Sequence, residues 1–287
     1  MFTAALLLAA IAAGPSSTES QIPPAIYTDP EKNTAHPARM VVLHIPSGDV
    51  QINGVAYLAA GAGPHPTIII CHGLPGNEKN LDLAQALRRA GWNAITFNYR
   101  GSWGSPGSFR FAQNPENARA VLAYLRAPEN AQKLGVDTSY LVIAGHSMGG
   151  WVSAMASTND DSIRGTILIS SGNLGKRFEI PRAELVARMA DNMESLAGTT
   201  AEAMAEELNV NAAAFDYTRG AVELANKPLL VLSSDDGLAP QSDALVAAVN
   251  KAGGKQVTAV HVATDHSWSD RRIRLQSEVL NWLATLK

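Results

Sequence analysis

Residues 141–149 read Leu-Val-Ile-Ala-Gly-His-Ser-Met-Gly, and this stretch decides the fold. At ordinary glycine and serine frequencies, its Gly-X-Ser-X-Gly pattern arises by chance in about one chain in ten of this length. Its surroundings make it specific, because four apolar residues precede it and a helical segment, 148–157, follows it. A strand, a sharp turn with an exposed serine and a helix together form a nucleophile elbow. The stretch therefore predicts Ser147 as a nucleophile, the alternative being a serine in an ordinary glycine-rich turn.

The two glycines of the pattern have a physical reason. The tight turn forces the serine backbone into a strained conformation and leaves no room for side chains at Gly145 and Gly149. The hydroxyl of Ser147 then projects above the sheet. We therefore expect an unusual backbone conformation at Ser147.

Outward from this stretch, short apolar segments alternate with helical ones. We expect strands at residues 67–71, 94–98, 140–144, 163–170, 228–232 and 257–262. We expect helices at 80–90, from a cap at Asn114 onward, at 148–157, at 240–252 and near the C-terminus. Residues 40–45 and 50–59 read as two edge strands, with a further turn signal at Asn53-Gly54. This order predicts an α/β fold, with a mostly parallel twisted sheet and helices on both faces.

The alternation stops between residues 172 and 227, where helical patterns occur without a clear strand. One of these patterns contains the capping-box signature Thr199-Thr200-Ala201-Glu202. We interpret residues 172–227 as a small helical cap inserted into one domain that spans residues 37–287. A chain of 287 residues is long enough for one such domain with a modest insertion. Residues 21–36 carry no periodic pattern and are expected to be a linker.

The composition allows a packed enzyme and argues against several classes of partner. Apolar residues make up 46% of the chain and charged residues 17%, which suits a large buried core. The 23 basic and 26 acidic residues give a formal net charge of -3 without a long single-sign run, so we expect no nucleic-acid partner. A single cysteine, Cys71, excludes an intramolecular disulfide and CxxC-type zinc or redox chemistry. No His, Asp or Glu spacing indicates a metal site.

The first residues carry a targeting signal. Residues 4–13 form an uncharged apolar run that ends in small residues and is short for a membrane span. We expect residues 1–20 to be a secretory signal peptide and the protein to be periplasmic or secreted. No Lys or Arg occurs before Lys32, so a mis-set start codon or a flexible apolar terminus is the alternative. No other stretch has the composition of a membrane span.

A serine nucleophile needs a histidine base and an acid that orients it, in the chain order Ser, Asp, His. Asp235 and Asp236 both follow the predicted strand 228–232, at the sheet edge where α/β sites are built. His266 follows the next predicted strand and is the expected base. His261 lies within that strand, where we expect a packed core histidine.

The tetrahedral oxyanion formed during acyl transfer requires two N–H donors. One should be the backbone N–H of Met148, directly after the nucleophile. The other should come from the loop 72–76, with the N–H of Leu74 as the best candidate. His72 is expected to shape this loop rather than to transfer protons, and Cys71 is expected to be a buried strand residue.

Other residues near the predicted site have structural as well as functional interpretations. Arg100 could bind a substrate carboxylate, although after a core strand an ion pair that fixes its loop is the preferred interpretation. The aromatic residues Trp103, Phe109 and Phe111 could line an acyl pocket or pack the cap against the sheet. Residues 190–216 contain six acids and no Lys or Arg, which we interpret as a solvated helix face.

From about Met40 to the C-terminus, the chain resembles the α/β-hydrolase superfamily. The matching segments are His72-Gly73, residues 98–105, the elbow, residues 236–240 and Asp265-His266. In members of the superfamily the acid stands a few residues before a proline, which implies Asp236 rather than Asp235. The segment 265–270 and the small cap are similar to bacterial cinnamoyl- and feruloyl-type esterases and to acyl- or dipeptidyl-peptidase-like hydrolases.

These residues lead to a functional hypothesis. We expect hydrolysis of a small-molecule carboxylic ester through an acyl-enzyme, with Ser147, Asp236 and His266 as the triad and with Leu74 and Met148 as oxyanion donors. This chemistry requires no cofactor. The nearest alternative is a peptidase or amidase that uses the same residues. A non-enzymatic binding protein on this fold is a third possibility, since fold alone does not establish function.

Overall fold

The computed structural model of the chain describes residues 21–158 and 160–286. The predicted signal peptide, residues 1–20, lies outside the described residues. The strands are β1 (Arg39–Ser47), β2 (Val50–Leu58), β3 (His65–Cys71), β4 (Asn93–Phe97), β5 (Val136–His146), β6 (Ile163–Ile169), β7 (Leu229–Ser234) and β8 (Val257–Val262). The α-helices are α1 (Leu81–Arg89), α2 (Gln113–Arg126), α3 (Pro128–Leu134), α4 (Met148–Ser157), α5 (Arg182–Ala190), α6 (Ala201–Val210), α7 (Ala212–Phe215), α8 (Ala221–Leu224), α9 (Ala239–Lys251) and α10 (Arg272–Ala284). Short 3₁₀ helices are η1 (Pro24–Ile26), η2 (Leu174–Glu179) and η3 (Tyr217–Gly220).

Over the described residues, the strands form one eight-stranded sheet in the order β1-β2-β4-β3-β5-β6-β7-β8. From β4 to β8 all neighbouring pairs are parallel, whereas β1 pairs antiparallel with β2 and β2 pairs antiparallel with β4. The sheet is therefore mostly parallel, as the sequence predicted. Its parallel strands all end at one edge, which is where a site can be assembled from several strand ends.

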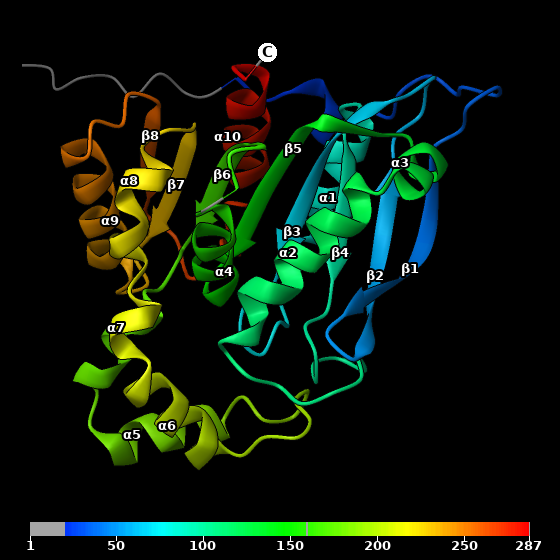
Figure 1. Cartoon of the computed structure of the whole chain (residues 1–287). Coiled ribbons are helices and arrows are strands. Elements are labelled where there is room, and N and C mark those ends of the chain that lie inside the picture. Colours follow the sequence, from blue (N-terminus) through cyan, green and yellow to red (C-terminus); the bar gives the residue numbers. More distant parts are fainter. Residues whose placement is uncertain (1–20, 159, 287) are drawn as a thin grey trace, which may run out of the picture.

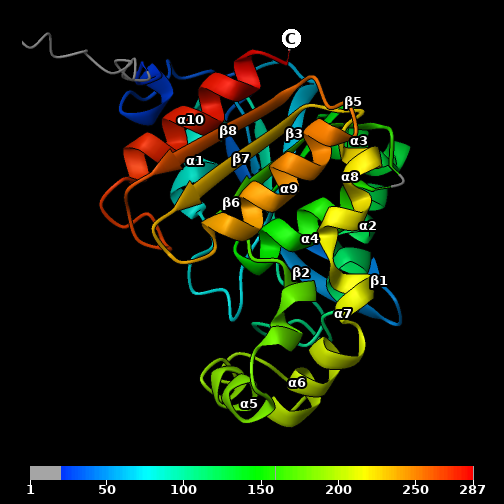
Figure 2. The ribbon, with the colours of Figure 1, turned by 90° about the vertical axis from the view of Figure 1, so that its left-hand side faces the viewer.

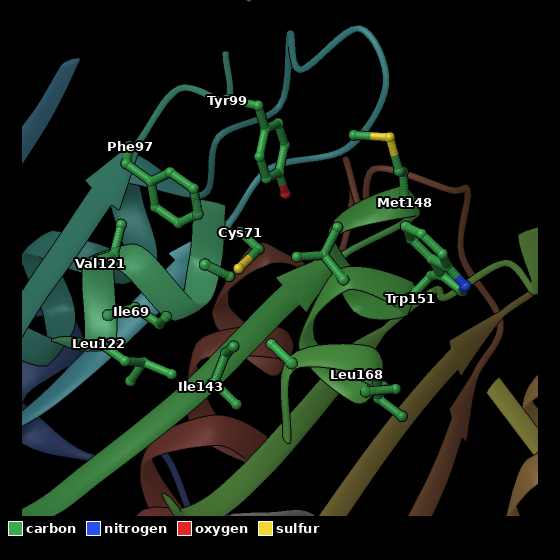
Figure 3. Close-up of a cluster of buried hydrophobic side chains, with 14 of the residues drawn as sticks. Ile69, Cys71, Phe97, Tyr99, Val121, Leu122, Ile143, Met148, Trp151 and Leu168 are labelled. Atoms are coloured by element: carbon green, nitrogen blue, oxygen red, sulfur yellow. The ribbon is translucent and has the colours of Figure 1, made fainter. Parts of the chain in front are cut away.

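Helices cover both faces of the sheet, with α1 and α10 on one face and α2, α4 and α9 on the other (Figures 1 and 2). Alternate residues of β3 supply both cores. Ile68 and Ile70 pack with residues of α1 and α10, whereas Ile69 and Cys71 pack with residues of α2 and α4. Figure 3 shows this second core running from Val121 of α2 to Trp151 of α4 beneath the strand ends. Both sheet faces are thus buried, which explains why the central strands read as continuous apolar runs.

Two expectations about the first strands are wrong. Of these two strands, β1 lies at an edge of the sheet but β2 does not, because β2 is inserted between β1 and β4. Asn53-Gly54 is not a turn but lies inside β2, where Gly54 pairs with Phe97. A Cβ at Gly54 would lie 3.0 Å from the carbonyl oxygen of Thr96, so the glycine serves close strand approach rather than a turn.

Two predicted helix caps are also displaced. Helix α2 begins at Gln113 after Ala112, so Asn114 is a buried first-turn residue and not its cap. In α6 the cap is Thr200, whose hydroxyl accepts a 3.1 Å hydrogen bond from the Ala203 N–H. The helix thus starts one residue later than the capping-box pattern implies, and Glu202 lies in its first turn.

Between β6 and β7 the described residues form helices and loops without a strand of the sheet. Helices α5 and α6 stand beyond the C-terminal ends of the parallel strands in both views (Figures 1 and 2). The backbone of residues 195–197 is bonded to the loop that follows β4, through Trp103 N–H to Ser195 O (2.9 Å) and Ala197 N–H to Gly101 O (2.8 Å). Within the described part of the chain, no helix is long and apolar enough to cross a membrane.

Candidate active site

Ser147 occupies the turn between β5 and α4. Its backbone has φ 58° and ψ -122°, a region that residues with side chains rarely adopt, so the expected strained conformation is confirmed. The Ser147 N–H donates to Ile169 O at 2.9 Å and ties the turn to β6. A Cβ at Gly145 would overlap the Gly149 carbonyl, and a Cβ at Gly149 would overlap the Cys71 carbonyl. The tight turn therefore exists only with glycine at both positions.

His266 lies in the loop after β8 and is paired with Asp236, which follows β7. The Nδ1–H of His266 donates to Oδ2 of Asp236 at 2.7 Å, and the Leu238 N–H donates to Oδ1 of the same carboxylate at 2.8 Å. The Asp236 side chain is 3% exposed and that of His266 39% exposed. With Nδ1 protonated, Nε2 of His266 has a free lone pair, which is the state a general base needs.

The carboxyl group of Asp236 is held in its charged form. Burial opposes its ionisation, but the hydrogen bonds from His266 and from the Leu238 N–H outweigh burial and bring its pKa below the ordinary value. Asp235 lies elsewhere. It is exposed and accepts a 2.9 Å hydrogen bond from Nε2 of His261. The structure thus brings His266 together with Asp236 and not with Asp235.

His146 fixes His266 next to the elbow. Its Nε2–H donates to the backbone carbonyl oxygen of His266 at 2.7 Å, and the centroids of the two rings are 4.7 Å apart. Burial, with a smaller effect of the His266 charge, lowers the pKa of His146 to about 4, so His146 is neutral at pH 7. Between the described side chains of Ser147 and His266 there is no hydrogen bond. Such bonds are often long in unliganded enzymes and tighten when substrate binds.

The loop after β3 carries the second predicted oxyanion donor, Leu74. Three hydrogen bonds shape this loop: His72 Nδ1–H to Gly73 O (2.7 Å), Trp103 Nε1–H to Pro75 O (2.6 Å) and Tyr99 Oη–H to His72 O (3.0 Å). Burial lowers the pKa of His72 to about 4, which agrees with a structural role for this neutral ring. Met148 is the first residue of α4, so its N–H has no acceptor within the helix.

A cavity of about 310 Å³ opens at Ser147. Its apolar wall comes from both the sheet side and the cap: Leu74, Phe111, Met148, Leu174, Met189 and Leu208. Its polar lining consists of Ser147, Arg177, Arg188, Asp191 and Asn192. A hollow of about 270 Å³ on β2 and β4 contains none of these residues, so the site is assigned to the cavity that holds Ser147. Mostly apolar walls with a few polar groups are typical of small-molecule sites.

Residues 68–275 match a family model that is described as the alpha/beta hydrolase family. The chain belongs to this family. The matched range of this α/β hydrolase contains the elbow and both residues of the Asp236–His266 pair. No curated protein matches the hydrolase in sequence.

Solved structures resemble this hydrolase in fold. The acylaminoacyl peptidase of Pyrococcus horikoshii is 16% identical with a TM-score of 0.66, and the match covers 86% of this chain and 41% of the peptidase. The Pyrobaculum calidifontis esterase is also 16% identical with a TM-score of 0.66, with 88% of this chain and 86% of the esterase covered. A puromycin-hydrolyzing peptidase of Mycobacterium tuberculosis is 16% identical with a TM-score of 0.65, and 88% and 40% are covered. The chain thus spans about two fifths of the length of either peptidase.

A buried hydrogen-bonded chain behind the acid was missed by the sequence analysis. The indole Nε1–H of Trp268 donates to Ser170 Oγ at 2.9 Å, and Ser170 Oγ lies 2.7 Å from Ser234 Oγ. The Ser234 hydroxyl in turn lowers the pKa of Asp236 in the hydrolase. Trp268 is fully buried with φ 59°. The only signal in the sequence was the position of Trp268 two residues after His266.

The prediction for His261 is wrong. Its side chain is 50% exposed, because β8 is the last strand of the sheet and none of its residues is fully buried. His261 lies opposite Ser233 in the β7–β8 ladder, and its Nδ1 lies 3.0 Å from the Ser233 hydroxyl. None of these groups lines the cavity at Ser147.

The structural interpretations of Arg100 and Cys71 are confirmed. Arg100 forms a 2.7 Å ion pair with Glu116 and does not line the cavity of the hydrolase. Cys71 is fully buried, and burial raises the pKa of its thiol to about 12, so it is not a nucleophile at neutral pH. Phe109 and Phe111 are fully buried beneath the cap, and Phe111 also lines the cavity. Within residues 21–158 and 160–286, no cluster of three or more metal-ligand side chains occurs.

The acidic bias of residues 190–216 has two origins. Four of the six acids are exposed on the cap, as a solvated helix face requires: Asp191, Glu194, Glu202 and Glu206. The other two bind main-chain or amide groups. Glu207 accepts from the N–H groups of Phe111 and Ala112 (3.0 and 2.8 Å), and Asp216 accepts from Asn173 at 2.8 Å. The solvated-face interpretation therefore holds for four residues and is wrong for Glu207 and Asp216.

Proposed function

We propose that this hydrolase cleaves carboxylic esters of small molecules through an acyl-enzyme intermediate. The observation that carries the proposal is the hydrogen bond from His266 Nδ1–H to the buried, ionised Asp236, beside a strained Ser147 that opens into a cavity. Ser147 is the nucleophile, His266 the general base and acid, and Asp236 the group that orients His266. The N–H groups of Met148 and Leu74 stabilise the oxyanion.

The reaction has two symmetrical halves. In the first, Ser147 Oγ attacks the ester carbonyl while its proton passes to Nε2 of His266, and the tetrahedral intermediate then expels the alcohol, which takes that proton. In the second, water gives a proton to His266 and attacks the acyl-enzyme. The second tetrahedral intermediate then expels Ser147 Oγ, which takes that proton from His266 as the carboxylic acid is released. Asp236 keeps its negative charge throughout and stabilises the imidazolium that forms in each half.

The lining of the cavity supports a small substrate with an apolar portion. Six apolar side chains face the space above Ser147, and about 310 Å³ corresponds to a compact organic molecule rather than a folded protein segment. The same residues could cleave an amide, because an amide differs mainly in the leaving group that His266 must protonate. A peptidase or amidase is therefore the second candidate, and the fold it shares with the Pyrococcus horikoshii acylaminoacyl peptidase is compatible with both.

The two candidates are separated by comparing substrates on the purified enzyme. We expect turnover of p-nitrophenyl acetate and p-nitrophenyl butyrate, and little turnover of aminoacyl p-nitroanilides. Amide turnover far above ester turnover would refute the esterase proposal. Labelling by a fluorophosphonate tests the nucleophile separately, and we expect labelling of the wild type and none of Ser147→Ala. Equal labelling of both proteins would remove Ser147 from the mechanism.

A further inference from the structure

The cavity at Ser147 contains an arginine without a counter-ion. Arg177 belongs to η2, the short helix after β6, and lines the same cavity as Ser147 and Met148. A Cβ at Gly172 would lie 3.3 Å from Nη2 of Arg177. The guanidinium therefore lies against the segment that follows β6, the strand to which the elbow is bonded. The side chain is partly buried, and among the described residues its guanidinium forms no hydrogen bond or ion pair, although the Arg177 carbonyl accepts from the Ile180 N–H. Its five N–H donors thus remain available to a ligand.

The other charged groups of the cavity do not neutralise Arg177. Arg188 is a second cation and is paired with Glu184 on α5. Asp191 is exposed to solvent and forms no ion pair with either arginine, within the described part of the chain. Burial and the charge of Arg188 both lower the pKa of Arg177, so its protonated form is desolvated and electrostatically opposed. A guanidinium nevertheless stays charged in proteins, and an anion would relieve both costs.

The segment that carries Arg177 is fixed in place before any ligand binds. Asn173 caps η2 by accepting from the Gly175 N–H at 3.0 Å. The Asn173 N–H donates to Gln241 Oε1 at 2.6 Å, and its side-chain amide donates to Asp216 Oδ1 at 2.8 Å. These bonds join η2 to α9 and to the start of η3. A positioned guanidinium binds a ligand with less loss of conformational entropy than a mobile one.

We propose that Arg177 binds a carboxylate of the substrate, so that the favoured esters carry a second, anionic group. This proposal rests on the esterase function proposed above. The planar guanidinium fork matches a carboxylate with two parallel hydrogen bonds, which favours a carboxylate over a neutral group. The apolar side chains of Leu174 and Met189 line the cavity together with Arg177 and suit a hydrocarbon portion between the ester and the carboxylate. A single unpaired cation suits a single negative charge.

The test compares two inhibitors that differ only in charge, 4-phenylbutyrate and 4-phenylbutanamide, against turnover of p-nitrophenyl acetate. In the wild type we expect the carboxylate to inhibit at about ten- to hundredfold lower concentration than the amide, the usual range for a charge-assisted hydrogen-bonded pair. In Arg177→Met this ratio should fall to about one, because methionine offers the carboxylate neither a charge nor N–H donors. Arg177→Lys, which keeps the charge without the fork, should retain an intermediate ratio.

Arg182→Met is the matched control, since Arg182 is 67% exposed on α5 and does not line the cavity. It should leave the inhibitor ratio unchanged. Equal inhibition of the wild type by both compounds, or an unchanged ratio in Arg177→Met, would overturn the proposal. Tighter inhibition by 3-phenylpropyl phosphate than by 4-phenylbutyrate would overturn the assignment to a carboxylate.

Direct binding separates this proposal from the esterase proposal. Thermal unfolding of the wild type, Arg177→Met and Arg177→Lys is measured with each of the two inhibitors. If no ester is hydrolysed but 4-phenylbutyrate alone raises the Tm of the wild type, and this effect disappears in Arg177→Met, the anion site stands without the esterase function. If both compounds shift the Tm equally in all three proteins, the anion site is refuted whatever the activity.

Discussion

Replacing Asp236 with asparagine tests the orientation of His266 directly. The two oxygens of Asp236 have different partners, since Oδ1 accepts from the Leu238 N–H at 2.8 Å and Oδ2 accepts from His266 Nδ1–H at 2.7 Å. An asparagine has only one oxygen. If that oxygen keeps the Leu238 bond, the amide N–H₂ faces Nδ1 and forces the His266 proton onto Nε2. The base then has no lone pair for the Ser147 proton.

The reversed amide does not rescue the enzyme, because it places two donors, the side-chain amide and the Leu238 N–H, against each other in a side chain that is 3% exposed. Such an unsatisfied buried contact costs about 1–3 kcal/mol. We therefore expect the wrong tautomer and a fall in kcat of about ten-thousandfold, the magnitude known for this substitution in Ser-His-Asp triads. This corresponds to about 5 kcal/mol of transition-state stabilisation. KM should change little, because Asp236 does not line the cavity.

The assay is initial-rate hydrolysis of p-nitrophenyl butyrate by the wild type, Asp236→Asn and Asp235→Asn, with thermal unfolding as a check of folding. Asp235 is the matched control, since it neighbours Asp236 in the sequence but is exposed and bonded to His261. Its substitution should alter kcat by less than about threefold, as expected for an exposed contact that does not line the cavity. A folded Asp236→Asn enzyme with more than about a tenth of wild-type kcat, or a larger loss in Asp235→Asn, would refute the reasoning.

Three further outcomes are expected. His146→Phe removes the hydrogen bond that holds the His266 carbonyl, so kcat should fall by about tenfold, equivalent to about 1.4 kcal/mol, with KM unchanged. An unchanged kcat for p-nitrophenyl butyrate in the folded variant would show that His146 does not position His266. Gly149→Ala should destabilise the fold by about 3 kcal/mol or more in urea unfolding, because the added Cβ overlaps the Cys71 carbonyl. Gly91→Ala is the control and should destabilise the fold less, since the space around its Cβ is open despite its φ of +89°. Equal urea midpoints for the two variants would contradict this prediction. Acidification should destabilise the protein between pH 6.5 and about 4, because His72 and His146 have folded-state pKa values of about 4, below the 6.5 of free histidine. Their neutral forms therefore stabilise the fold above pH 6.5, and about 3 kcal/mol per histidine is lost as pH falls to about 4. A urea midpoint that stays constant from pH 7 to pH 4 would contradict that assignment.

Local patterns predicted the central elements because each is determined by its own residues. The predicted bounds of α4, 148–157, and of β8, 257–262, agree with the structure. The strained φ of Ser147 followed from the glycines at 145 and 149, whose missing side chains are needed at that turn. Periodicity and turn chemistry act over a few residues, and the sequence displays them directly.

Properties that depend on strand order were not predictable in this way. The exposure of His261 follows from the position of β8 at the sheet edge, and no residue within β8 reports that position. The different surroundings of Asp235 and Asp236 depend on the register of β7 against β8, which places Ser233 opposite His261. Superfamily resemblance, rather than local pattern, favoured Asp236.

Arg177 illustrates the same limit at the cavity. It lies in a 3₁₀ helix without an amphipathic period, so its sequence neighbours do not distinguish it from a solvated arginine. Its place beside Ser147 arises because Asn173 joins η2 to residues about 40 and 70 positions away, Asp216 and Gln241. Contacts of that separation form only when the cap has folded onto the strand ends.

The hydrogen bonds that join residues 195–197 to the loop after β4 have a consequence for engineering. Helices α5 and α6 contribute Met189 and Leu208 to the cavity, whereas Ser147, Asp236 and His266 lie at the strand ends. Residues 195–197, which connect these two helices, are joined to Gly101 and Trp103 by backbone hydrogen bonds, and these bonds form a seam. Backbone bonds do not depend on side-chain identity. A chimera that exchanges α5 and α6 for another cap, but keeps this seam, should therefore acquire a new substrate range on an unchanged catalytic frame.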